Sequence, residues 1–279
     1  MNEKNQIAAL ITCYNRKENT VRCIQQLLFL KEGIDVYLVD DNSNDGTWEE
    51  VQLVFPQVKL IKGNGDLFWN RGMHLAWKHA SKEDYDYYLW LNDDVVLYQN
   101  CFEELFECEK LIESKCIISG IIESSEKSEI LYGGTNSNKK LIIPNGKMNP
   151  ITNMNGNVVL VPKDVFNLIG NLDPYYHHDL GDVDYGLMAL KKGIGAYTTR
   201  IPVASGERND LCRVRLNKTT LIKRCRKLYS PLGANPRISF YFHKKHYNFF
   251  YASLYFMFQH FLNIIPDGLN EKLFKNKYQ

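Results

Sequence analysis

Short apolar runs alternate with helix-like segments through residues 7–91, and polar side chains follow the ends of these runs. The pattern predicts strands over 7–12, 36–39, 58–61 and 87–91, with helices over 17–30, 47–55 and 70–80. Such alternation is typical of a mostly parallel α/β sheet. Ligands of these sheets bind at the carboxyl ends of the strands, so the polar residues there are the candidates for a site.

The densest group of ionisable side chains lies at 177–184, directly before a helix predicted over 187–192. It contains His177, His178, Asp179, Asp182 and Asp184. Neighbouring like charges shift one another's pKa, and a metal or a reacting hydroxyl is the usual reason to assemble them. We therefore expect a general base here. The adjacent histidines are interpreted as part of a strand, where they point to opposite faces, so a core or substrate contact is favoured over paired metal ligands.

Acidic side chains also follow the second and fourth predicted strands. The first group is Asp40, Asp41 and Asp45, and a carboxylate at that strand end suits the imide N–H of a pyrimidine base. An Asx-rich turn is the alternative interpretation. The second group is Asn92-Asp93-Asp94. Buried acids are unfavourable unless they are paired or bind a cation, and Mg²⁺ or Mn²⁺ with bound phosphates fits oxygen ligands. A helix N-cap is the alternative.

Residues 63–73 combine glycines, aromatic residues and one arginine, but lack the spacing of a dinucleotide-binding fingerprint. The glycines permit close approach of backbone, and Arg71 suits a diphosphate. A structural hairpin with packed aromatic side chains is the alternative.

The cysteines indicate a reducing compartment. Seven are present, none in a CxxC pair. This spacing favours reduced thiols in a cytoplasmic protein over a disulfide framework or a zinc site. The apolar run near the N-terminus is too short for a signal peptide.

Charge divides the chain near residue 210. Between Leu211 and Pro266 there is no Asp or Glu but ten Lys and Arg, which leaves −8 on the remainder. This basic part is rich in aromatic residues over 237–265 and favours an anionic partner. We expect domains at 1–210 and 211–279, with a helix over 249–265 lying peripherally on the inner face of the cytoplasmic membrane. A domain-covering helix or a homodimer contact is the alternative. A membrane-spanning helix is disfavoured because polar residues interrupt the apolar run. Nucleic acid is disfavoured as the anionic partner because no nucleic-acid-binding motif accompanies the charge.

Four motifs together resemble the inverting nucleotide-sugar glycosyltransferases of family 2, which have the GT-A fold. The resemblance covers about residues 6–205. The motifs are Thr12-Cys13-Tyr14-Asn15-Arg16, Val39 to Thr47, Leu91-Asn92-Asp93-Asp94 and Gly181 to Leu187. The resemblance implies a Rossmann-like sheet flanked by helices, with a small antiparallel portion and a C-terminal helical extension. It places the nucleotide-sugar half at about 1–97 and the acceptor half at about 98–210.

Individual roles follow from the resemblance. Asp182 matches the catalytic base, Asp94 the ligand of Mn²⁺ or Mg²⁺, Asp41 the contact to the base and Asp93 the position near the ribose. The other nucleotide-sugar contacts that we expect are Thr12, Tyr14, Asn15, Arg16, Asp66, Arg71 and Asn92. The expected acceptor-binding or supporting residues are Asp184, Asp179, His178 and Trp69.

The implied activity is metal-dependent transfer of a sugar, with inversion, from a UDP- or dTDP-sugar to a hydroxyl of a glycan or lipid-linked glycan. The Gly63–Trp69 segment resembles the rhamnosyltransferase-like branch that builds bacterial surface polysaccharides. The chain departs from the family at Asn92 and lacks a histidine over 202–208, so Asp94 and phosphate are left as the main metal ligands. Two alternatives remain: a sugar-nucleotide nucleotidyltransferase, and a non-catalytic sugar- or lipid-binding protein.

Overall fold

In the computed structural model the chain forms two compact units. The α/β unit comprises Met1–His177 and Gly181–Arg208, and the helical unit comprises His178–Leu180 and Asn209–Gln279. The residues that the structure describes are 5–127, 129–208, 212–213 and 215–274.

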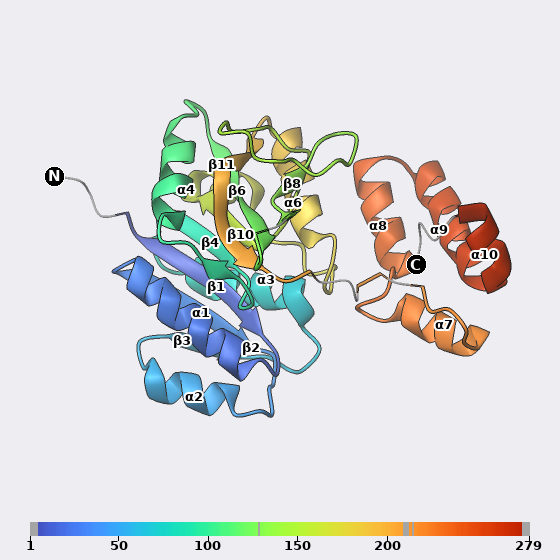
Figure 1. Cartoon of the computed structure of the whole chain (residues 1–279), viewed down its shortest axis with the longest axis horizontal. Helices are drawn as coiled ribbons and strands as arrows, with labels where there is room; N and C mark the ends of the chain where they lie inside the picture. Colours follow the sequence, from blue (N-terminus) through green and yellow to red (C-terminus); the bar gives the residue numbers. More distant parts are fainter. Residues whose placement is uncertain (1–4, 128, 209–211, 214, 275–279) are drawn as a thin grey trace. The chain divides into compact units, whose positions relative to one another are not determined.

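The α/β unit alternates strands and helices along its first half (Figure 1). Its strands are β1 (Ile7–Cys13), β2 (Ile34–Asp40), β3 (Lys59–Lys62), β4 (Tyr87–Leu91), β5 (Val96–Leu97), β6 (Cys116–Ser124), β7 (Ile130–Tyr132), β8 (Gly134–Thr135), β9 (Asn153–Met154), β10 (Val158–Pro162) and β11 (Gly195–Gly206). Its helices are α1 (Lys17–Leu30), α2 (Thr47–Val54), α3 (Phe68–Ala80), α4 (Cys101–Lys110), α5 (Lys163–Ile169) and α6 (Gly181–Lys191).

The main sheet has the strand order β3-β2-β1-β4-β10-β6-β11-β5, with β7 paired to β6. Strands β3, β2, β1 and β4 are mutually parallel, so their carboxyl ends meet at one edge. Strand β10 is antiparallel to both of its neighbours, whereas β6 and β11 are parallel to each other. The predicted α/β class, with a mostly parallel sheet and a small antiparallel portion, is confirmed.

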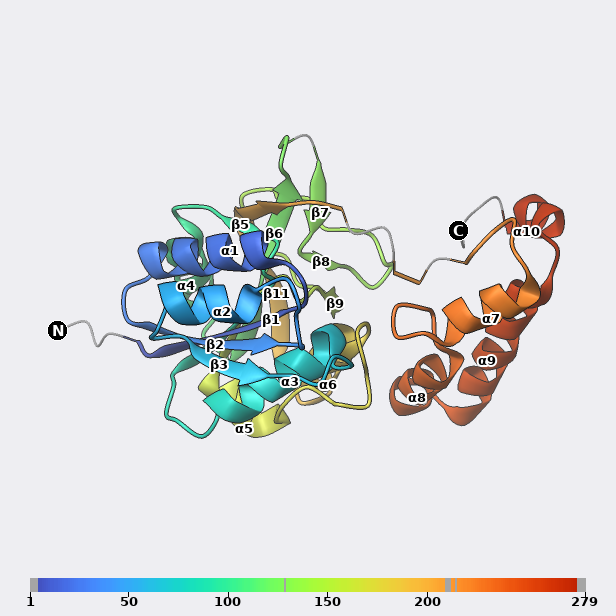
Figure 2. The ribbon, with the colours of Figure 1, turned by 90° about the horizontal axis from the view of Figure 1, so that it is seen from below.

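Helices cover both faces of this sheet (Figure 2). On one face α1, α2 and α4 bury residues such as Leu27, Val51 and Leu105 against the strands. On the other face α3, α5 and α6 do so, with Trp77 at the centre of an aromatic cluster. Neighbouring residues of β1 alternate between these two cores, as the pleat of a strand requires. The sheet is therefore fixed from both sides, and its strand ends are rigidly placed.

Two expectations about the acidic segment at 177–184 are wrong. Helix α6 begins at Gly181 and not at residue 187, so Asp182 and Asp184 lie in its first turn. Acidic residues in a first turn complement the positive end of the helix dipole, which explains the early start. His177 and His178 lie in a bend and not in a strand, so the argument from opposite strand faces does not apply to them. The sequence prediction also did not include α4 and β11.

The helical unit contains α7 (Leu221–Tyr229), α8 (Pro236–His246), α9 (Phe249–Ile264) and α10 (Asp267–Phe274). Asn235 and Asn248 cap α8 and α9 by accepting hydrogen bonds from backbone N–H groups. Among the described residues, no helix is both long and apolar enough to cross a membrane.

Candidate functional site

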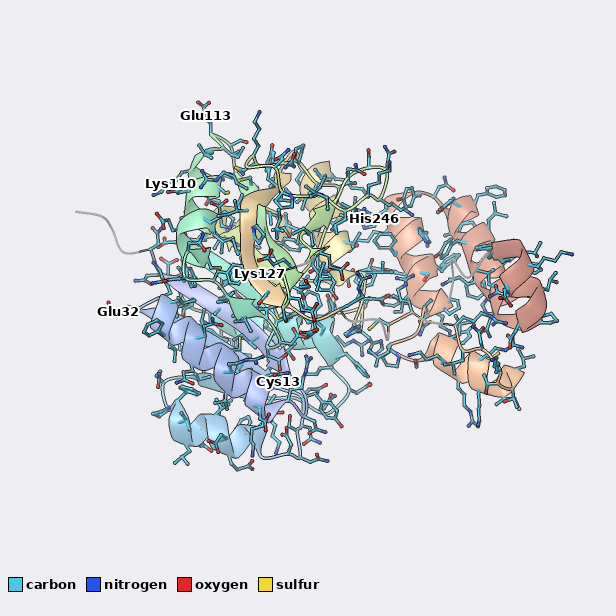
Figure 3. All side chains as sticks on the ribbon, in the orientation of Figure 1. Cys13, Glu32, Lys110, Glu113, Lys127 and His246 are labelled. Atoms are coloured by element: carbon cyan, nitrogen blue, oxygen red, sulfur yellow. The ribbon has the colours of Figure 1, made fainter. Side chains whose placement is uncertain are left out.

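The candidate site begins at the carboxyl ends of β1 and β2. Figure 3 labels Cys13, the last residue of β1, and Glu32, in the turn that leads into β2, at opposite ends of the sheet. Beyond Cys13, the backbone N–H of Asn15 donates to Ser43 Oγ at 2.9 Å, and Asn15 Oδ1 accepts from the Asn44 N–H at 2.8 Å. These bonds join the two loops that leave β1 and β2.

Backbone strain gathers at the same edge. Asn15, Asn42 and Phe68 have φ values of 50°, 64° and 56°, in the left-handed region. That conformation is uncommon for asparagine and unfavourable for phenylalanine, so the surroundings must hold it in place. All three residues lie in loops that leave strand ends or at the start of α3, where a ligand of this sheet would bind.

Asp41 holds the loop that leads into α3. Its Oδ1 accepts the Gly65 N–H at 2.8 Å, and its Oδ2 accepts the N–H groups of Leu67 at 2.8 Å and Phe68 at 3.1 Å. Gly63 is required beside it, because a Cβ there would lie 2.6 Å from Asp41 Oδ1. The side chain is buried. The carboxylate that we expect to contact a base therefore already organises the glycine-rich loop.

Asp45 joins the N-termini of two helices. Its Oδ2 accepts the Lys17 N–H of α1 at 2.9 Å, and its Oδ1 accepts the Thr47 N–H of α2 at 3.0 Å together with the Thr47 hydroxyl. Burial opposes ionisation, but the bonds from Thr47 and Lys17 prevail and lower the pKa of Asp45 below its ordinary value. Asp45 is therefore a structural acid.

Arg16 joins the two acids that follow β4. Its Nη1 lies 3.0 Å from Asp93 Oδ1, and its Nη2 lies 2.9 Å from Asp94 Oδ2. Thr20 Oγ1 donates to the other oxygen of Asp93 at 3.0 Å. Burial raises the pKa of Asp93 to about 6, against the opposing effect of Arg16. Both oxygens of Asp93 thus have partners, and its side chain is only 3% exposed.

Asp94 is the member of this pair that can reach a ligand. Its side chain is 29% exposed, and one of its oxygens faces Arg16. No group of three or more His, Cys, Asp or Glu among the described residues could hold a metal ion. These side chains therefore do not form a metal site in which the protein alone supplies every ligand. They fit a divalent ion that takes Asp94 and completes its coordination with phosphate oxygens and water, as Mg²⁺ commonly does.

A chain of hydrogen bonds runs from the end of β4 to Asp182. Trp69 Nε1 donates to Asn92 Oδ1 at 2.6 Å, and the amides of Asn92 and Asn157 bond to each other. The backbone N–H of the neighbouring Gly156 donates to Asp182 Oδ2 at 3.1 Å. A Cβ at Gly156 would lie 2.3 Å from the Trp69 ring, so the glycine allows the contact. The structure thus brings Trp69, Asn92 and Asp182 together.

Asn70 fixes the segment before α6 against α3. Its Nδ2 donates to the carbonyls of Asp173 at 2.8 Å and Tyr176 at 2.9 Å, and its N–H donates to His177 O at 3.0 Å. A Cβ on Gly181 would lie 1.7 Å from Asn70 Oδ1, so this contact requires glycine. The position of Asp182, one residue later, depends on this arrangement.

Other predicted site residues have structural partners in the α/β unit. Asp184 is buried and accepts the Tyr176 hydroxyl at 2.9 Å, so it supports the loop before α6. Arg71 Nε donates to Pro174 O at 2.9 Å. His177 Nε2 lies 4.0 Å from Asp66 Oδ2, and burial lowers the pKa of His177, with Arg71 contributing.

Thr12 and Tyr14 differ in their surroundings. Helix α3 passes so close to β1 that a Cβ on Gly72 would lie 2.2 Å from Thr12 Oγ1. Thr12 therefore faces the helix. Tyr14 is exposed at the end of β1, where its ring is open to a ligand.

His178 and Asp179 group with the helical unit. Arg213 Nη1 donates to Asp179 Oδ2 at 2.6 Å, and Cys212 Sγ lies 3.2 Å from His178 Nε2. Burial lowers the pKa of His178 and so favours its neutral form.

Sequence reasoning missed Thr20, Asn70 and Asn157. Thr20 carried a usable signal, since it lies at helical spacing with the buried Cys23, Ile24 and Leu27. Asn70 carried none, because asparagine is common at the start of a helix, where the prediction over 70–80 placed it. Asn157 carried none, because its role depends on where β10 pairs in the sheet.

Comparison with known proteins identifies the family. The model of the family described as "Glycosyl transferase family 2" matches residues 8–156, which is more than half of the chain. No curated protein is similar enough in sequence to count as a match.

Solved structures share the fold at low sequence identity. The mannosyltransferase PcManGT from Pyrobaculum calidifontis, in complex with GDP-Man and Mn²⁺, has a TM-score of 0.54 at 13% identity over 73% of this chain. TarS 1–349 of S. aureus has a TM-score of 0.52 at 10% identity over 72% of this chain. GalNAc-T7 with UDP, GalNAc and Mn²⁺ has a TM-score of 0.57 at 12% identity over 75% of this chain. The chain spans 57%, 60% and 45% of those chains, respectively. They support the GT-A assignment of the α/β unit, and by its sequence the chain belongs to glycosyl transferase family 2.

Proposed function

We propose that this protein is an inverting glycosyltransferase that uses a UDP- or dTDP-sugar and a divalent metal ion. The observation that carries the proposal is one hydrogen-bonded arrangement within a family 2 domain. It connects Asn92, beside Asp94, through Asn157 and Gly156 to Asp182. A donor diphosphate at the strand edge and an acceptor hydroxyl at α6 would then share one site.

The donor side is built from the ends of β1, β2 and β4. Asp41 and the loop that it holds would border the base, with Tyr14 exposed beside them. Asp93 would lie near the ribose. Asp94 would hold Mn²⁺ or Mg²⁺, which when bound neutralises the diphosphate. Arg16 and Arg71 would add positive charge, and Arg71 suits the leaving nucleoside diphosphate.

The acceptor side is built around the N-terminus of α6. Asp182 would take the proton of the attacking hydroxyl, and that oxygen would form the new bond to the anomeric carbon. The bond from that carbon to the diphosphate oxygen breaks on the opposite face, so one displacement inverts the configuration. Trp69 lies between the two sides through its bond to Asn92 and would pack against the sugar or the acceptor.

The acceptor that we propose is a glycan or a lipid-linked glycan of bacterial surface polysaccharide, within the rhamnosyltransferase-like branch. The support is the resemblance of the Gly63–Trp69 segment, which in the structure lies against the site through Asp41. We place donor binding in residues 1–97, acceptor binding in 98–210 and an extension in 211–279, at the cytoplasmic face of the membrane. Asp179 and His178 are proposed acceptor contacts.

The comparisons lend no support to a nucleotidyltransferase or to a non-catalytic binding protein. A nucleotidyltransferase would release pyrophosphate from a nucleoside triphosphate and a sugar phosphate. A binding protein would show neither donor hydrolysis nor transfer to any acceptor in a panel.

Donor binding is tested by thermal shift with UDP-, dTDP- and GDP-sugars, with and without Mn²⁺. Ligands that bind the native state raise the melting temperature. We expect a Mn²⁺-dependent rise with a UDP- or dTDP-sugar that Asp94→Asn removes. Asp84→Asn, which changes an exposed acid paired with Lys163, is the matched control and should keep the rise. A rise with GDP-mannose alone would overturn the donor assignment.

The base assignment is tested by transfer and binding together. Asp182→Asn should keep the nucleotide-dependent thermal shift while transfer falls by about 10²-fold or more, because proton transfer to a positioned base contributes about 10²–10⁴-fold. Near wild-type transfer by this variant would remove Asp182 from the chemistry.

A further inference from the structure

The exposed face of α9 is apolar, unlike the outer face of an ordinary surface helix. Its exposed positions include Phe250, Leu254, Met257, Phe261 and Ile264, which recur at helical spacing of three and four residues. Phe250 is 72% exposed. A soluble surface helix carries polar residues on its outer face and apolar residues towards the core. Here the outer face is an apolar stripe, which we call the α9 face.

The buried side of the same helix is mixed, with Ala252 and Leu262 beside the amides Gln259 and Asn263. Gln259 is buried and donates to Ala234 O at 2.7 Å and to Ser239 Oγ at 3.1 Å. Asn263 is also buried, with its Nδ2 at 3.3 Å from Cys225 Sγ. The contacts of these two amides hold α9 on its neighbours in the orientation that keeps the α9 face exposed. Helix α9 also contains no charged residue.

Exposed basic residues lie on the elements that precede α9 in the chain. The exposed Lys244 lies just before α9, and α7, which packs on α9, exposes Lys223 and Arg226. Asp267, which follows α9, is paired with Arg215 at 2.7 Å and with Arg224 at 3.4 Å. No acidic residue lies between Leu211 and Pro266. The unit therefore offers an apolar stripe with unbalanced positive charge.

We infer that the α9 face is inserted into the interfacial region of an anionic lipid bilayer. Apolar side chains would reach below the headgroups while the flanking lysines and arginines bind the anionic headgroups. A second copy of this chain fits less well, because a symmetric contact would bring two strongly basic units together. At 16 residues α9 is about 24 Å long, short of a hydrocarbon core of about 30 Å, so it lies along the surface.

Vesicle co-sedimentation of the full chain tests this inference without any donor or acceptor, so its outcome is independent of the proposed transfer reaction. The probes are vesicles of phosphatidylcholine alone and of equimolar phosphatidylcholine and phosphatidylglycerol. We expect binding to the mixed vesicles, reduced by salt, and at least about tenfold weaker binding of the triple variant Leu254→Gln, Met257→Gln, Phe261→Gln. The control is Phe29→Gln, Leu53→Gln, which changes exposed apolar residues of the α/β unit and should bind as wild type.

A variant with one added tryptophan reports insertion of the α9 face into the bilayer, because only one residue of α9 is changed. The native tryptophans, Trp48, Trp69, Trp77 and Trp90, all lie in the α/β unit. Phe250→Trp should therefore add emission that shifts to the blue with mixed vesicles, measured as the difference from wild type.

Three results would overturn the inference. One is the absence of binding to mixed vesicles. Another is binding that the triple variant retains, since charge alone would then suffice. The third is a dimer in light scattering that the triple variant converts to monomer, which would assign the α9 face to a second copy.

Discussion

Replacing Arg16 with glutamine tests whether one cation holds together the acids at the end of β4. Arg16 contacts Asp93 at 3.0 Å and Asp94 at 2.9 Å, and Asp93 is 3% exposed. Removing one partner of a fully buried ion pair costs about 3–5 kcal/mol. Because Arg16 is 42% exposed, water screens part of this charge. We therefore expect a loss of about 2 kcal/mol in the free energy of unfolding.

The assay is the melting temperature of Arg16→Gln in the presence of a chelator. A loss of about 2 kcal/mol corresponds to a fall of about 4–8 °C for a domain of this size. The matched control is Lys115→Gln, which removes an exposed ion pair with Asp164 of 3.0 Å. Exposed pairs contribute about 0–1 kcal/mol, so this control should melt close to wild type. If both variants melt alike, the ion pair at Arg16 contributes nothing.

The pH dependence identifies which acid is responsible. Burial raises the pKa of Asp93 to about 6, above its value of about 3.9 in the unfolded chain. A raised pKa gives stability that is present below the unfolded pKa and is lost as pH rises through about 6. Without Arg16 the ionised form is less favourable still. The destabilisation by Arg16→Gln should therefore be larger at high pH than at about pH 5, and a difference independent of pH would exclude Asp93.

Three further changes test the packing of the α/β unit. Gly72→Ala should destabilise by about 1–3 kcal/mol, because its Cβ would lie 2.2 Å from Thr12 Oγ1; a higher melting temperature, as expected for alanine in a free helix, would refute this. Asp41→Asn should cost about 2–3 kcal/mol in denaturant unfolding, because an amide cannot accept the N–H groups of Gly65, Leu67 and Phe68 together; unchanged stability would contradict that. A disulfide reagent should label at most two of the seven thiols in the native protein, since the other five are buried. Burial raises the pKa of Cys101, for example, to about 12, which disfavours the reactive thiolate. Rapid labelling of five or more thiols would refute this prediction.

Local signals predicted the regular elements of residues 7–91 well. The helix expected over 17–30 is α1, the strand over 87–91 is β4, and both have the expected bounds. The bounds of each element are set by nearby residues, because apolar side chains recur with the period of a helix or a strand until polar residues end the pattern. The common carboxyl edge of β1, β2 and β4 follows from their parallel order, so the assembly of the upstream acids was predictable.

What the sequence could not provide depends on partners distant in the chain. The antiparallel insertion of β10 between β4 and β6 places Asn157 beside Asn92, and neither segment specifies the other. The contact between Asn70 and Gly181 likewise joins residues far apart in sequence. The early start of α6 is different: acids in a first helical turn are a local signal, and the interpretation of Asp182 as a general base concealed it.

The four acids of the clusters differ in the partners that hold them. Asp41 and Asp45 each accept three hydrogen bonds, mostly from backbone N–H groups of other loops and helices, so their removal should lower stability first. The partner of Asp94 is the side chain of Arg16, which is 42% exposed. Asp182, in the first turn of α6, accepts the N–H groups of Gly156 at 3.1 Å and Val183 at 2.8 Å. Loss of stability should therefore be larger on removal of Asp41 or Asp45 than on removal of Asp94, although the sequence presents all four as members of similar clusters.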